Sequence, residues 1–215
     1  MIHQIHTVDQ ARKAAELGVD VIIAQGSEAG GQGMALGVGA MALLPQVADA
    51  VDPIPVLAAG GVADGRGLAA ALVLGSQGAN VGTRFLASEE ASAEEGWKRA
   101  ILQSESEDVV RFDAWEGIFP PAGGGAYATV PRVLPTPFVN EWLGRTQEAR
   151  REAEQLRDEV LSAIRGRTTH EVLPFSGQTA GLIHDILPAR EIVERMVAEA
   201  ELALTRADGF RSPGS

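Results

Sequence analysis

One stretch, residues 54–85, constrains the fold more than any other part of the chain. An apolar run leads into the glycine pair Gly60-Gly61, and Asp64 then stands where a helix N-cap is expected. A run of strong helix formers follows, and Gly75 ends it as a C′ glycine does. A second short apolar run ends in Gly82-Thr83. A strand, a helix and a strand within about thirty residues predict a parallel βαβ unit.

The turns Gly60-Gly61 and Gly82-Thr83 fall at the C-terminal ends of the two predicted strands. Ligands of parallel α/β proteins bind at that edge, and glycine lets backbone N–H groups approach a phosphate closely. The Thr83 hydroxyl is a further donor. Alternatively, the glycines only relieve crowding between strand and helix. We favour a phosphate site, because both turns carry glycine at matching positions.

Four strand–helix units follow one another in the first half of the chain. We expect strands at residues 2–6, 19–24, 54–59 and 79–81, and helices at residues 7–17, 41–51, 64–74 and 92–103, the last capped by Ser92. The strands are apolar and the crossovers are short, which predicts a parallel α/β sheet or barrel. The strand at 19–24 leads into a glycine-rich loop, residues 25–33, at the same edge as the two turns.

The sequence divides into four parts. Residues 1–105 hold the strand–helix units, and residues 106–140 are expected to be irregular because 117–140 contain five prolines and four glycines. We interpret this segment as a lid rather than a disordered connector. Residues 141–207 are expected to form amphipathic C-terminal helices that pack on the barrel. One has apolar positions from Ala149 to Ile164, and one begins at Pro188 with apolar positions that include Ile192, Val193, Met196 and Val197. Residues 208–215 are expected to form a disordered tail.

Charge and composition exclude several classes of protein. The net charge is −11, with 29 acidic against 18 basic residues, which argues against nucleic acid or an anionic membrane as a partner. Cysteine is absent, so disulfides, thiolate metal sites and cysteine nucleophiles are excluded. The four histidines show no metal-binding spacing, and we expect no metal site. Neither a signal peptide nor an apolar run of about 18 residues is present, which predicts a soluble, cytoplasmic protein.

Three motifs together are similar to those of the nitronate monooxygenase family, formerly called 2-nitropropane dioxygenase. They read A-Q-G-S-E-A-G-G-Q-G at 24–33, P-V-L-A-A-G-G-V-A-D-G-R-G at 55–67 and G-T-R-F at 82–85. The resemblance spans residues 2–103 and returns at G-Q-T-A-G, residues 177–181. Their order and spacing are specific to this family and its FMN-dependent enoyl-ACP reductase relatives. The resemblance implies an FMN-dependent enzyme with a TIM-barrel fold.

By that resemblance, Gly60-Gly61 and Gly82-Thr83 hold the FMN phosphate after the seventh and eighth strands of the barrel. Gln25 and the backbone of Ala29-Gly30-Gly31 lie along the ribityl chain and the isoalloxazine ring. Phosphate-binding barrels without flavin also carry glycines after strands seven and eight. The E-A-G-G loop, residues 28–31, favours FMN.

The family histidine that takes a proton from the carbon next to the nitro group is replaced here by Gln32. A carboxamide is not basic enough to act as a general base, although Gln32 could hydrogen-bond an anionic nitronate. His6, at the end of the first predicted strand, could point into the same cavity, but a lone histidine there is more often structural. Gln32 and His6 are our two candidate catalytic residues.

The chain is shorter than a complete barrel, which needs eight strand–helix units and about 250 residues. The four units correspond to the family's strands five to eight, so we expect a C-terminal fragment, either truncated or started at an internal codon. A half barrel leaves sheet edges unpaired at residues 2–5 and near residues 78–82. The chain is therefore expected to be poorly folded alone or oligomeric, with a homo-oligomer as one form of the assembly.

The function predicted from the sequence is FMN-dependent oxidation of alkyl nitronates, with a small nitronate or nitroalkane and O₂ as the reactants. The flavin carries the redox chemistry, and the protein binds and orients. Two alternatives remain open. One is an enoyl-ACP reductase-like enzyme, and the other is an inactive half-barrel remnant that associates with itself or with an N-terminal half.

Overall fold

A four-stranded parallel sheet forms the centre of the N-terminal part. The computed structural model describes residues 1–34, 37–120 and 129–209. The strands are β1 (Ile2–Ile5), β2 (Val21–Gln25), β4 (Val56–Ala59) and β5 (Gly78–Asn80), in the order β1-β2-β4-β5. All three pairings are parallel, as predicted. β1 and β5 stand at the edges of this sheet, where the unpaired edges were expected.

Helices follow the strands; those at residues 8–16, 40–51, 65–73 and 95–102 were predicted, and the short helix at 83–86 was not. They are α1 (Val8–Glu16), α2 (Ala40–Val51), α3 (Gly65–Val73), the short α4 (Thr83–Leu86) directly after β5, and α5 (Glu95–Leu102). The Thr7 hydroxyl accepts from the Gln10 N–H (3.2 Å), while the Gln10 side chain accepts from the His6 N–H (2.8 Å). Asp64 caps α3 by accepting from the N–H groups of Arg66 and Gly67. These caps satisfy donors at the first turn that have no partner within the helix.

The cap predicted for α5 was wrong. Its N-cap residue is Glu94, two residues after Ser92, and no side chain makes a capping bond there. The His170 ring packs directly against Gly96 of α5. A Cβ at position 96 would lie 2.2 Å from that ring, so glycine permits this contact.

The core of the sheet combines strand and helix side chains. Ile5, Ile22 and Val56 of the sheet are almost fully buried together with Leu43 and Val47 of α2. Burying each aliphatic side chain of this size stabilises the fold by about 1.5–3 kcal/mol. The sheet is therefore packed against α1 and α2, and the loops that follow its strands lie at its C-terminal edge.

Residues 106–140 are more regular than expected. The described residues contain η1 (Ser106–Asp108), β6 (Val110–Arg111), α6 (Trp115–Ile118), β7 (Thr129–Val133) and the start of α7 (Pro137–Trp142). Pro137 is the first residue of α7, where proline costs no helical bond, and Thr136 caps the helix through Val139 N–H (3.1 Å). Pro137 thus begins a helix, and Pro131 lies within β7. Part of the predicted lid, residues 121–128, lies outside the described residues, and lid motion stays a prediction.

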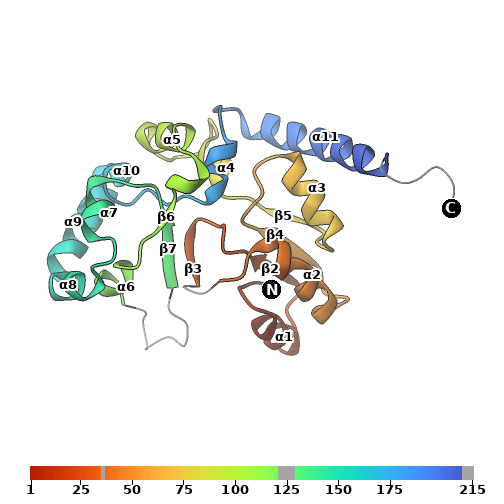
Figure 1. Ribbon diagram of the computed structural model, residues 1–215, viewed down its shortest axis with the longest axis horizontal. Helices are drawn as coiled ribbons and strands as arrows, with labels where there is room; N and C mark the ends of the chain where they lie inside the picture. Colours follow the sequence, from red (N-terminus) through yellow and green to blue (C-terminus); the bar gives the residue numbers. More distant parts are fainter. Residues whose placement is uncertain (35–36, 121–128, 210–215) are drawn as a thin grey trace.

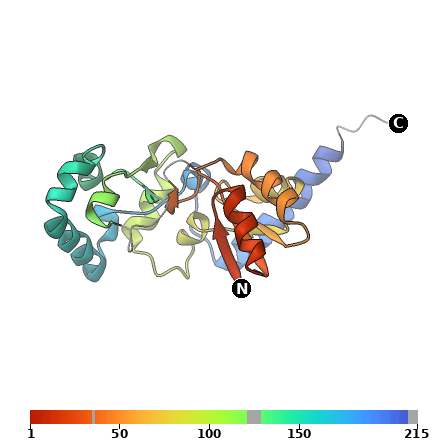
Figure 2. The same cartoon turned by 90° about the horizontal axis from the view of Figure 1, so that it is seen from below.

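A second, three-stranded antiparallel sheet joins the two parts of the molecule. Its order is β3-β7-β6, with β3 (Gly31–Met34) coming from the glycine-rich loop. Beyond it lies a helical cluster of α6, α7, α8 (Thr146–Arg151), α9 (Ala153–Gly166) and α10 (Thr169–Val172). This cluster has its own core, which includes Phe112, Phe138, Trp142 and Leu156. Figure 2 shows the helical cluster at one end of the molecule and the parallel sheet towards the other.

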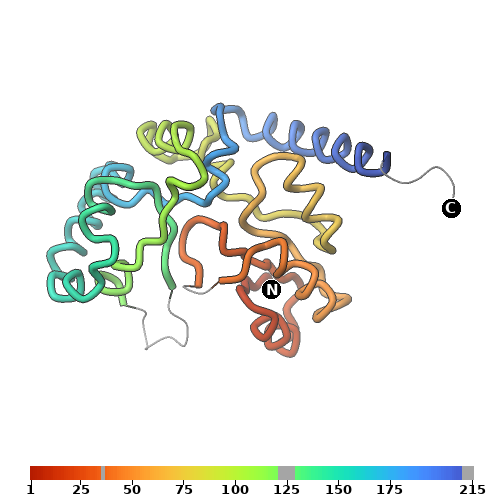
Figure 3. The backbone as a smooth tube through the Cα atoms, viewed as in Figure 1, coloured from red at the N-terminus to blue at the C-terminus, as the bar shows by residue number. Residues whose placement is uncertain are grey.

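The chain returns from the helical cluster to the sheet through η2 (Gln178–Leu182) and then forms the long helix α11 (Ala189–Asp208), as Figure 3 traces. α11 crosses α3 at Gly65, where a Cβ would lie 2.3 Å from the Ala200 backbone nitrogen. Pro188 precedes α11 as its N-cap residue.

The predicted apolar faces of the C-terminal helices need correction. On α11, Ile192 and Met196 are buried, but Val193 and Val197 are about half exposed. Ile164 of α9 is also half exposed. The apolar faces that pack are therefore narrower than the sequence pattern suggested. The predicted tail is corrected as well, since α11 continues to Asp208; residues 210–215 lie outside the described residues.

Candidate active site

A cavity of about 570 Å³ opens at the C-terminal edge of the parallel sheet, and we call it the large cavity. Its volume lies within the roughly 300–1,000 Å³ of small-molecule sites. The loop after β2, the turns after β4 and β5, and residues 175–179 contribute to its lining. The structure brings together here most of the predicted cofactor residues, namely Gln25, Ala29, Gly30, Gly31, Gly60, Gly82 and Thr83.

The glycines of the two turns have different physical reasons. Gly60 has φ +84°, and a Cβ there would lie 2.8 Å from the Ala29 backbone nitrogen. Gly60 is therefore needed for backbone conformation and close packing. Gly82 has negative φ and no atom within 4 Å of a built Cβ, so its missing side chain leaves space in the large cavity. Gly61 lines a neighbouring cavity beside Glu28 instead.

The Thr83 side chain is oriented by the backbone opposite it. Its Oγ1 accepts a hydrogen bond from the Gly177 N–H (2.9 Å), and Thr83 is only 8% exposed. A hydroxyl that accepts one bond can still donate its own proton. Thr83 can therefore offer a fixed O–H donor to a ligand in the large cavity.

Glu28, the acidic residue of the E-A-G-G loop, has a structural role. Its carboxylate accepts from the Ala40 N–H at 2.9 and 3.0 Å, at the first turn of α2, where the N-cap Gly39 has no side chain. A carboxylate is favourable at a helix N-terminus. The Glu28 carbonyl also accepts from Gln178 N–H (2.9 Å). Glu28 thus fixes the loop that presents the backbone of Ala29-Gly30-Gly31 to the cavity.

The segment 174–179 crosses that loop at very short range. A Cβ on Gly30 would lie 2.5 Å from the Gly177 nitrogen, so glycine is required for the crossing. The segment brings Phe175 to the cavity, where the Trp97 indole N–H donates to the Phe175 carbonyl (3.1 Å). With Phe85, these rings give the cavity aromatic side chains suited to a flat ring. Phe85 ends the quoted G-T-R-F motif without having been assigned a role, and Trp97 and Phe175 were not predicted, although the motif at 177–181 pointed to the segment that carries Phe175.

Gln4 is a further lining residue that the sequence analysis missed. Its Nε2 donates to Gln25 Oε1 (2.9 Å), and both side chains line the large cavity. That bond orients the Gln25 amide and leaves its two N–H donors available to a ligand. The alternation of side chains along β1 could have indicated Gln4, because alternate residues of a strand lie on one face of the sheet.

Neither candidate catalytic residue lines the large cavity. Gln32 lies in β3 with an exposed side chain and is not among the residues that line the large cavity. His6 lines a very small cavity of about 10 Å³, behind Gln25 and Ala29. Burial lowers the pKa of His6, with a hydrogen bond to the Gln25 backbone opposing the shift, so His6 is neutral at pH 7. None of the described residues that line the large cavity has a titratable side chain.

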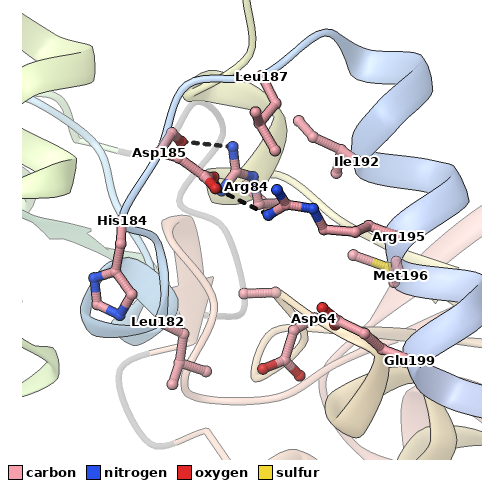
Figure 4. A pocket seen from close by; sticks show the side chains of 11 residues that line it. Asp64, Arg84, Leu182, His184, Asp185, Leu187, Ile192, Arg195, Met196 and Glu199 are labelled. Atoms are coloured by element: carbon pink, nitrogen blue, oxygen red, sulfur yellow. Dashed lines mark hydrogen bonds and ion pairs between the residues drawn. The ribbon is translucent and has the colours of Figure 1, made fainter. Parts of the chain in front are cut away.

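Arg84 of the G-T-R-F motif belongs to a different site at the same edge. Figure 4 shows it in a cavity of about 170 Å³, the charged cavity, facing Asp185 and Arg195. Arg84 donates to Asp185 Oδ1 (2.8 Å) and to the Asp185 carbonyl (2.7 Å), and Arg195 donates to Asp185 Oδ2 (2.9 Å). Burial alone would raise the pKa of Asp185, but the bonds from Arg195 and Arg84 lower it. Arg84 therefore ties residues 185–188 and α11 to the end of β5.

The described residues hold neither a candidate metal cluster nor a membrane-spanning helix. In residues 1–34, 37–120 and 129–209, no three His, Asp or Glu side chains are grouped to hold a metal ion. No helix within these same ranges has the length and apolar character needed to cross a membrane.

Comparison with known proteins agrees with this architecture. Residues 1–199 match the sequence model of the family described as nitronate monooxygenase. A nitronate monooxygenase of Neurospora crassa is 32% identical over 224 residues, covering 96% of this chain and 55% of that protein. FabK of Thermotoga maritima superposes with a TM-score of 0.83 at 32% identity, covering 97% of this chain and 63% of FabK. Nitroalkane oxidase of Streptomyces ansochromogenes gives a TM-score of 0.78 at 30% identity, covering 95% of this chain and 58% of the oxidase.

The predicted fold class is confirmed, since the parallel sheet and its helices are of the TIM-barrel type, with four strands in place of eight. The chain spans about half the length of the Neurospora relative. The family match extends over nearly the whole chain and includes the three motifs and the loops of the large cavity. The chain belongs to the nitronate monooxygenase family.

Proposed function

We propose that this chain binds FMN in the large cavity and takes part in the oxidation of alkyl nitronates by O₂. The observation that carries the proposal is the convergence of Gln25, residues 29–31, Gly60 and Gly82-Thr83 on one cavity. These are positions at which the family resemblance places FMN. The resemblance by itself could not show that they would meet.

The residues of the large cavity fit a flavin mononucleotide. A phosphate would find the Thr83 hydroxyl donor beside the space left by Gly82. The flat ring would find Phe175 and Trp97, and its polar edge would find amide donors of Gln25. FMN, when bound, supplies the redox chemistry, since it accepts electrons from the substrate and transfers them to O₂.

The chain's own residues would bind and orient the reactants. Because none of the described lining residues titrates, they provide no base that could take a proton from a neutral nitroalkane. A nitronate has already lost that proton. The cavity therefore favours nitronates as substrates over the parent nitroalkanes.

An absorption spectrum of the purified protein, followed by titration with FMN, tests the binding step. We expect flavin bands that stay with the protein during gel filtration, and turnover of a preformed alkyl nitronate with O₂ uptake. A protein that takes up no FMN would contradict the proposal and favour the inactive half-barrel.

The family resemblance leaves enoyl-ACP reductase-like chemistry as the second candidate, because the apolar side of the cavity (Val62, Phe85, Leu86) also suits an acyl chain. Such an enzyme consumes NADH or NADPH in the presence of an enoyl thioester. A flavin-loaded protein that reduces the thioester but leaves nitronates unchanged would replace our proposal with this one.

A further inference from the structure

Two side chains face each other without a hydrogen bond where the helical cluster meets α5. His170 of α10 and Glu94, the N-cap residue of α5, approach to 3.8 Å between Nδ1 and Oε2. Both atoms are buried, and neither has a hydrogen-bond partner among the described residues. A separation of 3.8 Å is too long for a hydrogen bond. Buried polar atoms of folded proteins are mostly paired, so this contact leaves a place for one bonding hydrogen.

A proton on His170 would satisfy both atoms. A carboxylate oxygen is only an acceptor, and so is the Nδ1 of a neutral imidazole that carries its hydrogen on Nε2. In that form the two facing atoms repel each other. The protonated ring has an Nδ1–H donor, and a movement of about 1 Å would make a charge-assisted hydrogen bond to Glu94. Because negative charge is favourable at the first turn of a helix, the proton goes to the imidazole and Glu94 stays ionised.

Glu94 is the ion-pair partner of His170 in the part of the chain that the structure describes. The helices α5, α7 and α9 pack against α10. Their other charged side chains near the junction bond elsewhere or are exposed, as is that of the neighbouring residue of α10; they are Glu95, Lys98, Glu141, Arg165, Arg167 and Glu171. The charge of His170 is therefore balanced by one carboxylate.

The junction acts on the large cavity through the first turn of α5, which lies beside α10 (Figure 1). The His170 ring is so close to the backbone of Gly96 that a Cβ there would lie 2.2 Å from it. The next residue, Trp97, donates its indole N–H to the Phe175 carbonyl (3.1 Å). Trp97 and Phe175 both line the large cavity. A displacement of this turn relative to α10 would therefore move part of the cavity wall.

We propose that His170 and Glu94 form a proton-binding site that fastens the helical cluster to α5 and positions Trp97 in the wall of the large cavity. Uptake of a proton draws the two side chains together, and its release lets the first turn of α5 move away from α10. His170 is a positioning residue, because it acts on the cavity through α5. The cavity thus responds to pH through a site outside its own lining. The inference goes beyond the proposed function and does not depend on FMN.

NMR of the full chain tests the proposal on the indole N–H of Trp97, whose resonance is assigned by its loss in Trp97→Phe. We expect this resonance to titrate between pH 8 and pH 5, the range in which histidine changes its charge. The titration should disappear in His170→Gln and in Glu94→Gln, each of which removes one partner and keeps a side chain of similar size. His3→Gln, which removes an exposed histidine of β1, is the matched control and should leave the titration unchanged.

Urea unfolding is an independent measurement. The protonated pair stabilises the folded protein at low pH, and this contribution is lost as pH rises and His170 releases its proton. Between pH 8 and pH 5.5, the unfolding equilibrium constant of His170→Gln relative to that of the unmutated protein should rise up to about fivefold, the upper value for an ion pair that is not fully buried. Glu94→Gln should show the same rise.

Three results would overturn the proposal. They are a Trp97 resonance that stays constant over this pH range, a titration that persists in His170→Gln or Glu94→Gln, and a pH dependence of stability that is the same in the unmutated protein and the variants. Since each variant removes one side of the pair, one folded variant is enough to decide the outcome.

Discussion

The large cavity and the charged cavity lie at the same edge of the parallel sheet but differ in chemistry. The large cavity is lined by glycine, amide and aromatic groups, and its described lining has no titratable side chain. The charged cavity holds Arg84, Asp185 and Arg195, which are bonded to one another (Figure 4). The ion pairs of the charged cavity thus hold α11 against the end of β5, whereas the large cavity, whose described lining is uncharged, is the candidate ligand site. Variants of each cavity should accordingly affect different properties.

The largest expected effect concerns the missing base of the large cavity. We expect preformed nitronates to be oxidised on the order of 10²–10⁴-fold faster than the parent nitroalkanes, the usual contribution of a positioned general base. Gln32→His should narrow this gap little, because position 32 does not line the large cavity. His6→Ala should leave it unchanged, because His6 lies behind Gln25 and Ala29.

Turnover of a nitroalkane and its nitronate, measured side by side in the FMN-loaded protein, checks this prediction. Nitroalkane activity that disappears in His6→Ala would assign the base to His6. Equal turnover of both substrates by the unmutated protein would mean that a base reaches the substrate from outside the described lining.

The second prediction tests whether the large cavity is the ligand site. Gly82→Val places a side chain in open space of that cavity at negative φ, so the fold should tolerate it. Overlap with the cofactor should cost about 1–3 kcal/mol, or roughly 10- to 100-fold in FMN affinity. Fluorescence titration measures the affinity. Gly33→Val, at another glycine with no atom within 4 Å of its built Cβ but outside this cavity, is the matched control. If Gly82→Val bound FMN with unchanged affinity, the phosphate site would not lie at Gly82.

Sequence reasoning predicted the elements of the site whose signals are local. The turns at Gly60 and Gly82 follow apolar strands, and their positions at one sheet edge follow from parallel pairing. Phe175 could not be predicted in this way, because it reaches the cavity only through the packing of the returning segment. Gln32 stands next to Gly31, which lines the large cavity, but the side chain of Gln32 is exposed and does not line it.

The third prediction concerns a variant that removes the ion pair of the charged cavity without changing the lining of the large cavity. Arg84→Met removes donors to Asp185 and to the Ala87 carbonyl (3.1 Å) from a side chain that is 7% exposed. Stability should fall by about 1.5–3 kcal/mol, the value of hydrogen bonds to charged groups, and FMN affinity should change little. Arg195→Met, at a half-exposed side chain, should cost under about 1 kcal/mol. Urea unfolding measures the free energy of unfolding of both variants. A greater loss of stability in Arg195→Met than in Arg84→Met would show that Arg195, and not Arg84, makes the stronger contact with Asp185.

The smallest expected effect is the acid sensitivity of the charged cavity. The pKa of Asp185 is lowered in the folded protein, so its ionised form contributes stability that is present above the ordinary aspartate pKa and is lost as pH falls through the lowered value. Asp185 is partly exposed, which limits this contribution to under about 1 kcal/mol. Urea midpoints from pH 5 down to pH 3 should therefore fall slightly less in Asp185→Asn than in the unmutated protein, since the variant has no carboxylate to protonate at this position. FMN affinity over the same range should show no matching difference between the two proteins, because Asp185 does not line the large cavity. A parallel loss of FMN affinity that depends on Asp185 would show that the two cavities are coupled, and the division between a charged anchoring site and an uncharged ligand site would have to be abandoned.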